Sequence, residues 1–91
     1  MFLKDPGARL DYRLDWGPRL GGGLSITGSE WRVDPVETDG LTVETSAVDG
    51  LETVVWLAGG RVGSLYCATN RIFLSDGSID ERSLTIRVEN R

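Results

Sequence analysis

Two alternating segments on either side of an Asp-Gly pair form the clearest pattern in the sequence. In the second segment, Leu84, Ile86 and Val88 alternate with polar residues, as in a strand that places one face on a core and the other in water. A cluster of glycines precedes the first segment. Residues 58–88 are therefore predicted to form a long antiparallel hairpin that the chain enters through a tight corner.

Gly60, Gly63 and Tyr66, at the entry to this hairpin, have the spacing of a tyrosine corner. In that motif a Tyr near the start of the sixth strand of an immunoglobulin-like sandwich bonds its hydroxyl group to the backbone a few residues upstream. Glycine suits the approach, because a side chain there would obstruct the ring or disfavour a positive φ. The alternative is that Tyr66 is an ordinary half-buried strand aromatic.

The rest of the chain divides into short segments with the two-residue period of strands, separated by Gly, Pro and Asp-Gly turn signals. These segments are residues 9–16, 24–27, 30–34, 41–46 and 51–58. The turn signals recur about every 8 to 12 residues, which is typical of sandwiches. The sequence thus predicts an all-β, immunoglobulin-like antiparallel β-sandwich of about six or seven strands, with Trp31 where such domains bury a central Trp.

Residues 1–8 are predicted to form an N-terminal arm, and residues 9–91 a single β-sandwich domain. Phe2 and Leu3 stand apart from any periodic run, and a Pro-Gly pair separates them from the first strand segment. Such an arm is either frayed or reaches onto a neighbouring subunit in a symmetric assembly.

Composition argues against several classes of function. The 91 residues are 40% hydrophobic, and no apolar run approaches the ~20 residues of a membrane span. The net charge of -4 disfavours binding to nucleic acid, which needs a basic face. The single cysteine, Cys67, cannot form an internal disulfide, and the chain contains no histidine to activate it. We therefore predict no catalytic residues, no cofactor, no metal site and no secretory signal.

Acidic residues are concentrated in the middle of the chain. Residues 30–52 contain seven Asp or Glu residues and a single basic one, Arg32. Two interpretations stay open. The stretch is a solvated face, or it is an acidic surface that steers docking onto a basic partner.

Apolar side chains also occupy positions predicted to face outward. If Val55 of segment 51–58 faces the core, Trp56 faces away from it. Phe73 takes a similar outward position on the first arm of the hairpin, which in immunoglobulin-like order belongs to the other sheet, so the two define separate surfaces. Trp56 is either part of a contact surface or covered by the arm or a loop. The candidate interface residues are Phe2, Leu3, Val54, Trp56, Leu65 and Phe73.

Several short motifs resemble those of a known family. They are Leu10-Asp11-Tyr12, Trp31-Arg32-Val33, Val55-Trp56-Leu57-Ala58-Gly59-Gly60, Thr69-Asn70-Arg71-Ile72 and Arg82-Ser83-Leu84-Thr85-Ile86-Arg87-Val88. With these motifs the chain resembles small tailed-phage and prophage proteins that are usually labelled phage fiber-tail adaptor proteins. The resemblance runs from about Asp5 to the end and is most specific over residues 59–72. Cys67 and Phe73 depart from it, since more polar or β-branched residues are expected there.

The resemblance implies a noncatalytic virion structural protein with an immunoglobulin-like fold. It would be assembled in the host cytoplasm in many symmetric copies and bound to head, neck, tail or fibre proteins, with no nucleic acid or membrane as a partner. The first hypothesis is an adaptor, neck or fibre-attachment module, and the alternative is a capsid decoration protein. A carbohydrate- or receptor-binding module is a further alternative, because aromatic sandwich faces bind sugars and Trp56 is such an aromatic. An enzyme is disfavoured, because the carboxylates are scattered along the chain.

Overall fold

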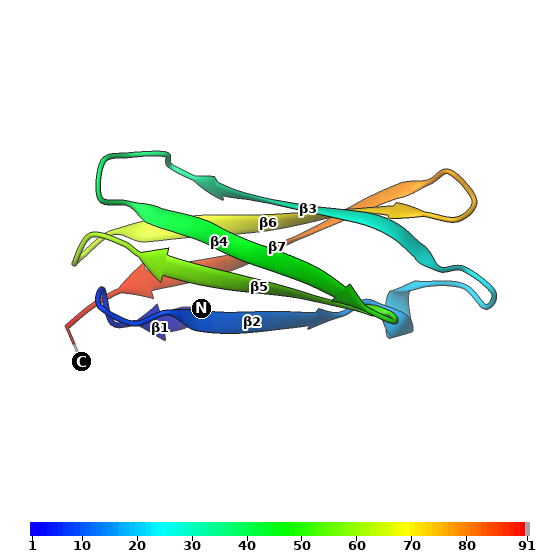
Figure 1. The fold of residues 1–91 in the computed structure, drawn as a ribbon, viewed down its shortest axis with the longest axis horizontal. Helices are drawn as coiled ribbons and strands as arrows, with labels where there is room; N and C mark the ends of the chain where they lie inside the picture. The colour runs from blue at the N-terminus through cyan, green and yellow to red at the C-terminus, as the bar shows by residue number, and fades with distance from the viewer. Residues whose placement is uncertain (91) are drawn as a thin grey trace.

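The computed structural model describes residues 1–90, which form two facing β-sheets (Figure 1). The four-stranded sheet, hereafter sheet A, contains in spatial order β1 (Phe2–Lys4), β7 (Ile79–Val88), β6 (Leu65–Leu74) and β3 (Ile26–Asp34). The three-stranded sheet, hereafter sheet B, contains β2 (Leu10–Asp15), β5 (Glu52–Gly59) and β4 (Leu41–Asp49). A short 3-10 helix, η1 (Gly17–Arg19), follows β2.

Every pair of neighbouring strands is antiparallel except β1 and β7, which run parallel. When β2 to β7 are taken as strands B to G of an immunoglobulin domain, sheet B has the order B-E-D and sheet A contains the order G-F-C. These are the two sheets of the immunoglobulin arrangement, with the first strand moved to the edge beside strand G. The immunoglobulin-like sandwich predicted from the sequence is confirmed.

A single strand, β3, includes the two segments that were predicted as separate strands before residue 35. Residues 28 and 29 were left between the two predicted segments, but the register only shifts between Ile26 and Gly28 and the strand continues. The absence of a side chain at Gly28 has a packing reason, because a Cβ there would lie 3.3 Å from Cδ2 of Phe73 on the neighbouring strand. A bulge thus lies where the prediction had a gap between two strands, and a large aromatic side chain occupies the space above it.

The segment expected to be an N-terminal arm contributes β1 to sheet A. Lys4 pairs with Val88, and its side chain is fully buried. Its Nζ donates hydrogen bonds to the carbonyl oxygens of Gly59 at 2.7 Å and Asp5 at 2.9 Å. Burial lowers the pKa of Lys4, and the negative charge of Asp5 acts against this shift. The first strand is therefore held by its pairing with β7 and by a contact with the end of β5.

Side chains from the inner faces of both sheets form two adjoining apolar clusters. One includes Leu57, Tyr66 and Ile86, and the other includes Trp16, all of them at most 1% exposed. Trp31, on strand β3, is only half-buried and packs against both clusters. The central Trp position of the immunoglobulin fold is thus occupied as predicted, but the fully buried tryptophan is Trp16, which directly follows β2.

A buried polar network joins the two sheets near the second cluster. The side chain of Asn70 on β6 is fully buried, and its amide group donates to Ser29 Oγ at 2.8 Å and to the carbonyl oxygen of Glu30 at 2.9 Å. Its Oδ1 accepts from Trp16 Nε1 at 3.0 Å and from Thr53 Oγ1 at 2.7 Å. An Asn side chain can make four such bonds, so this buried amide is fully satisfied.

Candidate protein interface

The outer face of sheet A carries exposed apolar side chains at the end where β1 joins it. The register of β1, β7 and β6 places Leu3, Arg87 and Leu65 side by side across three strands. Their neighbours along the strands point into the core, so these three side chains face outward. Leu65 is 54% exposed and Leu3 is 42% exposed. We call this set the Leu3–Leu65 row.

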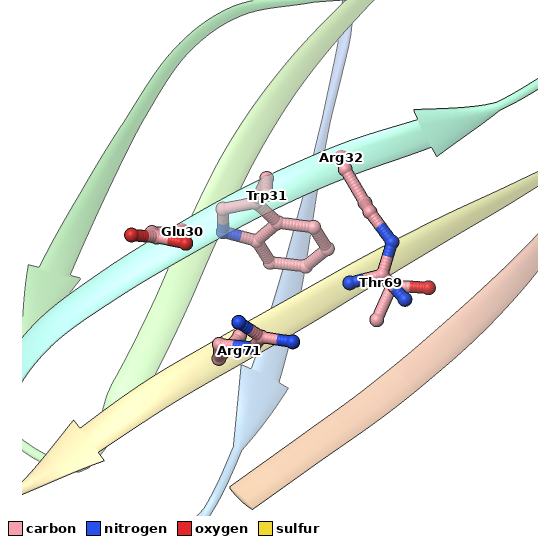
Figure 2. Close-up of a pocket in the computed structure, with 5 residues that line it drawn as sticks. All are labelled: Glu30, Trp31, Arg32, Thr69 and Arg71. Carbon is pink, nitrogen blue, oxygen red and sulfur yellow. The ribbon is translucent and has the colours of Figure 1, made fainter. Parts of the chain in front are cut away.

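The centre of the same face is a groove between β3 and β6 with a volume of about 310 Å³. Figure 2 shows Glu30 and Arg32 on β3 beside Thr69 and Arg71 on β6, with the ring of Trp31 drawn between the two strands. Thr69 Oγ1 lies 2.9 Å from Ser83 Oγ on the adjacent strand. Polar groups therefore line this groove from both strands.

The charges of the groove are paired within the chain. Arg71 Nε lies 2.6 Å from Glu81 Oε2, and Arg32 Nη1 lies 3.6 Å from the same oxygen. The hydrogen bond from Arg71 lowers the pKa of Glu81, and the same contact raises the pKa of Arg71. Because both arginines already contact a carboxylate, the groove does not resemble an anion-binding site.

Phe73 lies on this face at the end opposite the Leu3–Leu65 row. It is half-buried over Gly28 and pairs across the strands with Ile79, which is 56% exposed. Ile79 was not among the predicted interface residues, because the regular alternation of the second arm begins only at residue 83. Phe73 is therefore more covered than an outward aromatic was expected to be, and its neighbour supplies the exposed apolar surface.

Trp56 and Val54 lie on the outer face of sheet B, away from Leu65 and Phe73. Val54 is only 7% exposed and Trp56 is half-buried. The guanidinium carbon of Arg9 lies 4.4 Å from the centroid of the Trp56 ring, and Arg9 also forms an ion pair with Glu44. A cation over an aromatic face is a favourable contact. A residue that directly follows the expected arm thus covers part of the Trp56 ring.

Phe2 connects the first strand with sheet B. It is 45% exposed, and its ring makes an edge-to-face contact with Tyr12 on β2, with ring centroids 5.2 Å apart. Phe2 pairs with Ile86, whose side chain is fully buried, so Phe2 points toward the rim of the core and not along the outer face of sheet A. Of the two candidate residues in β1, only Leu3 belongs to the outer apolar surface.

A family comparison identifies the kind of protein to which these surfaces belong. The family model described as podophage GP4 fiber-tail adaptor protein gp77 matches residues 4–87 of the 91-residue chain. The chain belongs to this family. Fiber-tail adaptors are structural proteins of the phage particle that bind other virion proteins. No curated protein matches the chain significantly.

The part of the chain that the family model matches begins at Lys4 and includes β2 to β6 and nearly all of β7. Leu65 therefore lies inside the matched region, while Leu3 lies just before it. Within residues 1–90, no three His, Cys, Asp or Glu side chains are grouped so that they could hold a metal ion. In the same residues, no helix has the length and hydropathy needed to span a membrane.

The tyrosine corner residues lie at the end of the sandwich near the Leu3–Leu65 row. The backbone N–H of Arg61 donates to the Tyr66 hydroxyl group at 2.9 Å, and that hydroxyl donates to Glu37 Oε1 at 2.5 Å. Gly60 and Gly63 have φ angles of +108° and +85°. Glu37 comes from the β3–β4 loop, and nothing in its sequence context indicated this contact. The hydroxyl group thus links the β3–β4 loop to the β5–β6 loop through hydrogen bonds.

Proposed function

We propose that this chain is a noncatalytic adaptor that joins two other components of the virion through separate protein contacts. In this proposal the Leu3–Leu65 row on sheet A is the centre of the first contact. The observation that carries it is the exposure of these leucines, 42% and 54%, on an ordered sheet face. The site of attachment would be at the neck or fibre base, and several copies would be arranged with symmetry.

The surroundings of the Leu3–Leu65 row support this role. Contacts between proteins are typically apolar at their centre and polar at their rim. The row adjoins the half-buried Cys67 and the polar residues Thr69 and Ser83, and the groove with its paired charges begins beyond them. Ion pairs that are already satisfied within the chain cost little to place at a rim. The leucines are the groups that gain most from being covered.

The second contact of an adaptor has to lie elsewhere, and sheet B supplies candidates. Trp56 and Val54 were predicted as interface residues, and both lie on the sheet opposite Leu65. Arg9 already rests on the Trp56 ring, so a partner there would meet a cation and an aromatic edge and not a bare apolar platform. This arrangement also gives little support to a sugar-binding role for Trp56, because stacking on a sugar needs a free ring face.

The experiment replaces one leucine with a charged residue and counts copies in particles. We expect Leu65→Asp to lower the number of particle-bound copies by about 30-fold or more, since loss of an interface anchor typically costs roughly 2 kcal/mol or more. Val36→Asp is the matched control, because Val36 is 91% exposed and belongs to the loop between β3 and β4, not to a strand of sheet A. Circular dichroism checks that both variants fold.

The result has a clear contrary outcome. If Leu65→Asp is incorporated at the normal level while Trp56→Ala is absent from particles, sheet B makes the main contact. The proposal that the Leu3–Leu65 row is an interface would then be wrong. If particle images place the chain on the capsid shell, away from the neck and fibres, the protein is a decoration protein and not an adaptor.

A further inference from the structure

The free edge of β4 differs from the other open edges of the sandwich. β4 pairs only with β5 in sheet B, so its other side has no strand partner within residues 1–90. Natural proteins usually protect such edges with charges, prolines or very short strands. β1 is three residues long, β2 carries charged side chains at alternate positions, and β3 has a bulge and three charges near its end. β4 also has a bulge between Val43 and Thr45 and charges at Glu44 and Asp49, but residues 45–48 between them read Thr-Ser-Ala-Val and have none of these protections.

The backbone groups of Ser46 and Val48 point to this free side. Asp49 and Glu52 close a two-residue turn at Gly50, which has a φ angle of +61°. In such a hairpin the closing pair exchanges both backbone hydrogen bonds, and bonded and non-bonded pairs then alternate along the ladder. The pairs of Val48 with Thr53 and of Ser46 with Val55 are therefore non-bonded. Their N–H and C=O groups on β4 are directed away from β5.

The side chains of this segment are also uncovered on the inner side. Ser46 and Val48 are paired with Val55 and Thr53, both of which are fully buried, yet Ser46 is exposed and Val48 is 41% exposed. Figure 1 shows that β4 diverges from β3 as it approaches the turn at Gly50, so β3 does not cover this part of β4. A strand added beside β4 would bond to the free backbone groups and cover Val48 from the side.

The charge around this edge indicates what kind of strand would fit. Residues 33–60 contain six acidic residues and no Lys or Arg. Near the turn, Arg13 is shared by Asp11, Asp49 and Glu52 at 3.9 Å from each, which leaves three carboxylates with one cation. A second copy that paired its own β4 edge with this one would bring another segment without bases, and like charges across strands are destabilising. A segment with lysines or arginines would be attracted.

We propose that the β4 edge accepts an extended, basic segment of another virion protein as an additional strand of sheet B. The inference rests on the proposed adaptor function, and it assigns the second contact of the adaptor to β-strand addition. In this binding mode the backbone ladder supplies affinity, and alternate side chains supply specificity. The basic residues of the segment would lie near Asp49 and Glu44, and small or β-branched residues would lie beside Ser46 and Val48.

The test uses the whole protein, labelled with nitrogen-15, and two synthetic peptides as probes. One is acetyl-Lys-Thr-Val-Thr-Val-Lys-amide, and the other has Glu in place of both Lys. We expect the basic peptide to shift the amide resonances of Ser46 and Val48 and to slow their hydrogen exchange. Binding should weaken as salt is added, and the acidic peptide should leave these resonances unchanged.

Variants at Val48 separate the backbone contact from the side chain. Val48→Pro removes a free N–H without touching the ladder to β5, so its melting curve should stay close to that of the native protein. Its affinity for the basic peptide should fall about tenfold, because the variant cannot form the backbone hydrogen bond from residue 48 to the added strand. Val48→Thr keeps the N–H and should bind nearly as well as the native protein.

The outcomes distinguish this inference from the proposed adaptor function. Leu65→Asp should bind the peptide normally and still fail to enter particles. If the peptide shifts no resonance of β4, or if both peptides shift them equally, the inference is wrong whatever the particle counts show. If the Ser46 and Val48 resonances shift with protein concentration alone, the strand that occupies the edge belongs to a second copy of the chain. The proposal of a basic partner would then be wrong.

Discussion

Two tyrosines in this sandwich differ in what their hydroxyl groups contact. Tyr66 accepts from the Arg61 N–H and donates to Glu37, whereas the buried hydroxyl oxygen of Tyr12 has no hydrogen-bond partner within residues 1–90. A buried polar group without a partner costs free energy, and a partnered one contributes about 1 kcal/mol. The same Tyr-to-Phe change should therefore have opposite effects at the two positions.

We expect Tyr66→Phe to lower the free energy of unfolding by about 1 to 2 kcal/mol, because it leaves the Arg61 N–H and the Glu37 carboxylate without their common partner. Tyr12→Phe should leave stability unchanged or raise it slightly. Urea denaturation of both variants at neutral pH gives the comparison. Equal midpoints would show that the tyrosine corner contributes nothing to stability.

Alkaline pH provides an independent test of Tyr12. Burial raises the pKa of its hydroxyl group above the ordinary value of 10.0. Above pH 10 the unfolded chain loses this proton while the folded chain retains it, so the unfolded state binds fewer protons and stability falls as pH rises. The Tyr12→Phe variant should lose less stability than the native protein between about pH 9.5 and 11. Thermal melts across this pH range provide the measurement. If Tyr12 did not contribute, the melting temperatures of the native protein and of the variant would fall in parallel.

Asn70 is the polar residue whose replacement should cost most. In the Asn70→Asp variant an acceptor oxygen would replace the amide nitrogen that donates to Ser29 Oγ and to the Glu30 carbonyl oxygen, and a charge would be buried where the amide was fully hydrogen-bonded. We expect a loss of about 3 kcal/mol or more at pH 7. The loss should shrink toward acid pH, where the introduced carboxyl group binds a proton. Asn90→Asp, at an exposed position, is the control and should change stability little.

At the scale of single elements, the connection between β5 and β6 depends on two glycines for different reasons. A Cβ at Gly60 would lie 2.5 Å from Cγ2 of Val88, which is fully buried, whereas a Cβ at Gly63 would have no neighbour within 4 Å. Both residues have positive φ angles. A side chain at Gly63 would therefore introduce backbone strain alone, whereas a side chain at Gly60 would introduce both backbone strain and a steric clash with Val88.

We expect Gly63→Ala to cost about 1 to 2 kcal/mol and Gly60→Ala about 3 kcal/mol or more. Guanidinium melts of the two variants measure the difference directly. Circular dichroism is needed for Gly60→Ala, because a displaced Val88 would also disturb the pairing of β7 with β1. If both variants lost the same free energy of unfolding, Val88 would move aside at little cost, and the predicted steric clash would be wrong.

The strands that the sequence predicted well are those whose side chains alternate without interruption. β7 and β2 were recognised because Ile86 and Leu14 each lie among polar neighbours that face water. The sequence did not predict that the two segments of β3 form one strand, because the alternation breaks at Gly28 and the packing of Gly28 beneath Phe73 depends on a residue far along the chain. Distant packing of this kind leaves no local periodicity.

The interface residues were harder to predict than the strands, since alternation indicates which way a side chain points but not what covers it. Trp56 points outward as predicted, but Arg9 covers it. The pairing of β1 with β7 determines that Leu3 and Leu65 become neighbours, and three residues of strand give no detectable period. Lys4 gave no sign that it would be buried, because lysine is among the residues least often found inside a protein.

For the molecule as a whole, elongation separates the proposed contacts. The sandwich measures 43 × 21 × 19 Å, and its connecting loops gather at the two ends of the long axis (Figure 1). The Leu3–Leu65 row lies on sheet A near one end, and the β4–β5 turn beside the proposed docking edge lies at the other. Two partners could therefore bind without touching each other, as an adaptor requires.

The parallel pairing of β1 with β7 also determines how this domain would respond to mechanical tension. The chain enters the pair at Phe2 and leaves it at Val88, so its two ends depart in opposite directions along the strands. Pulling on these ends slides one strand along the other and strains the hydrogen bonds between them, including the one from Glu89 N–H to Lys4, all at once. An antiparallel pair at the termini would instead open one bond at a time under a much smaller force. The first strand is thus placed where a shearing load, such as a fibre would transmit, meets its greatest resistance.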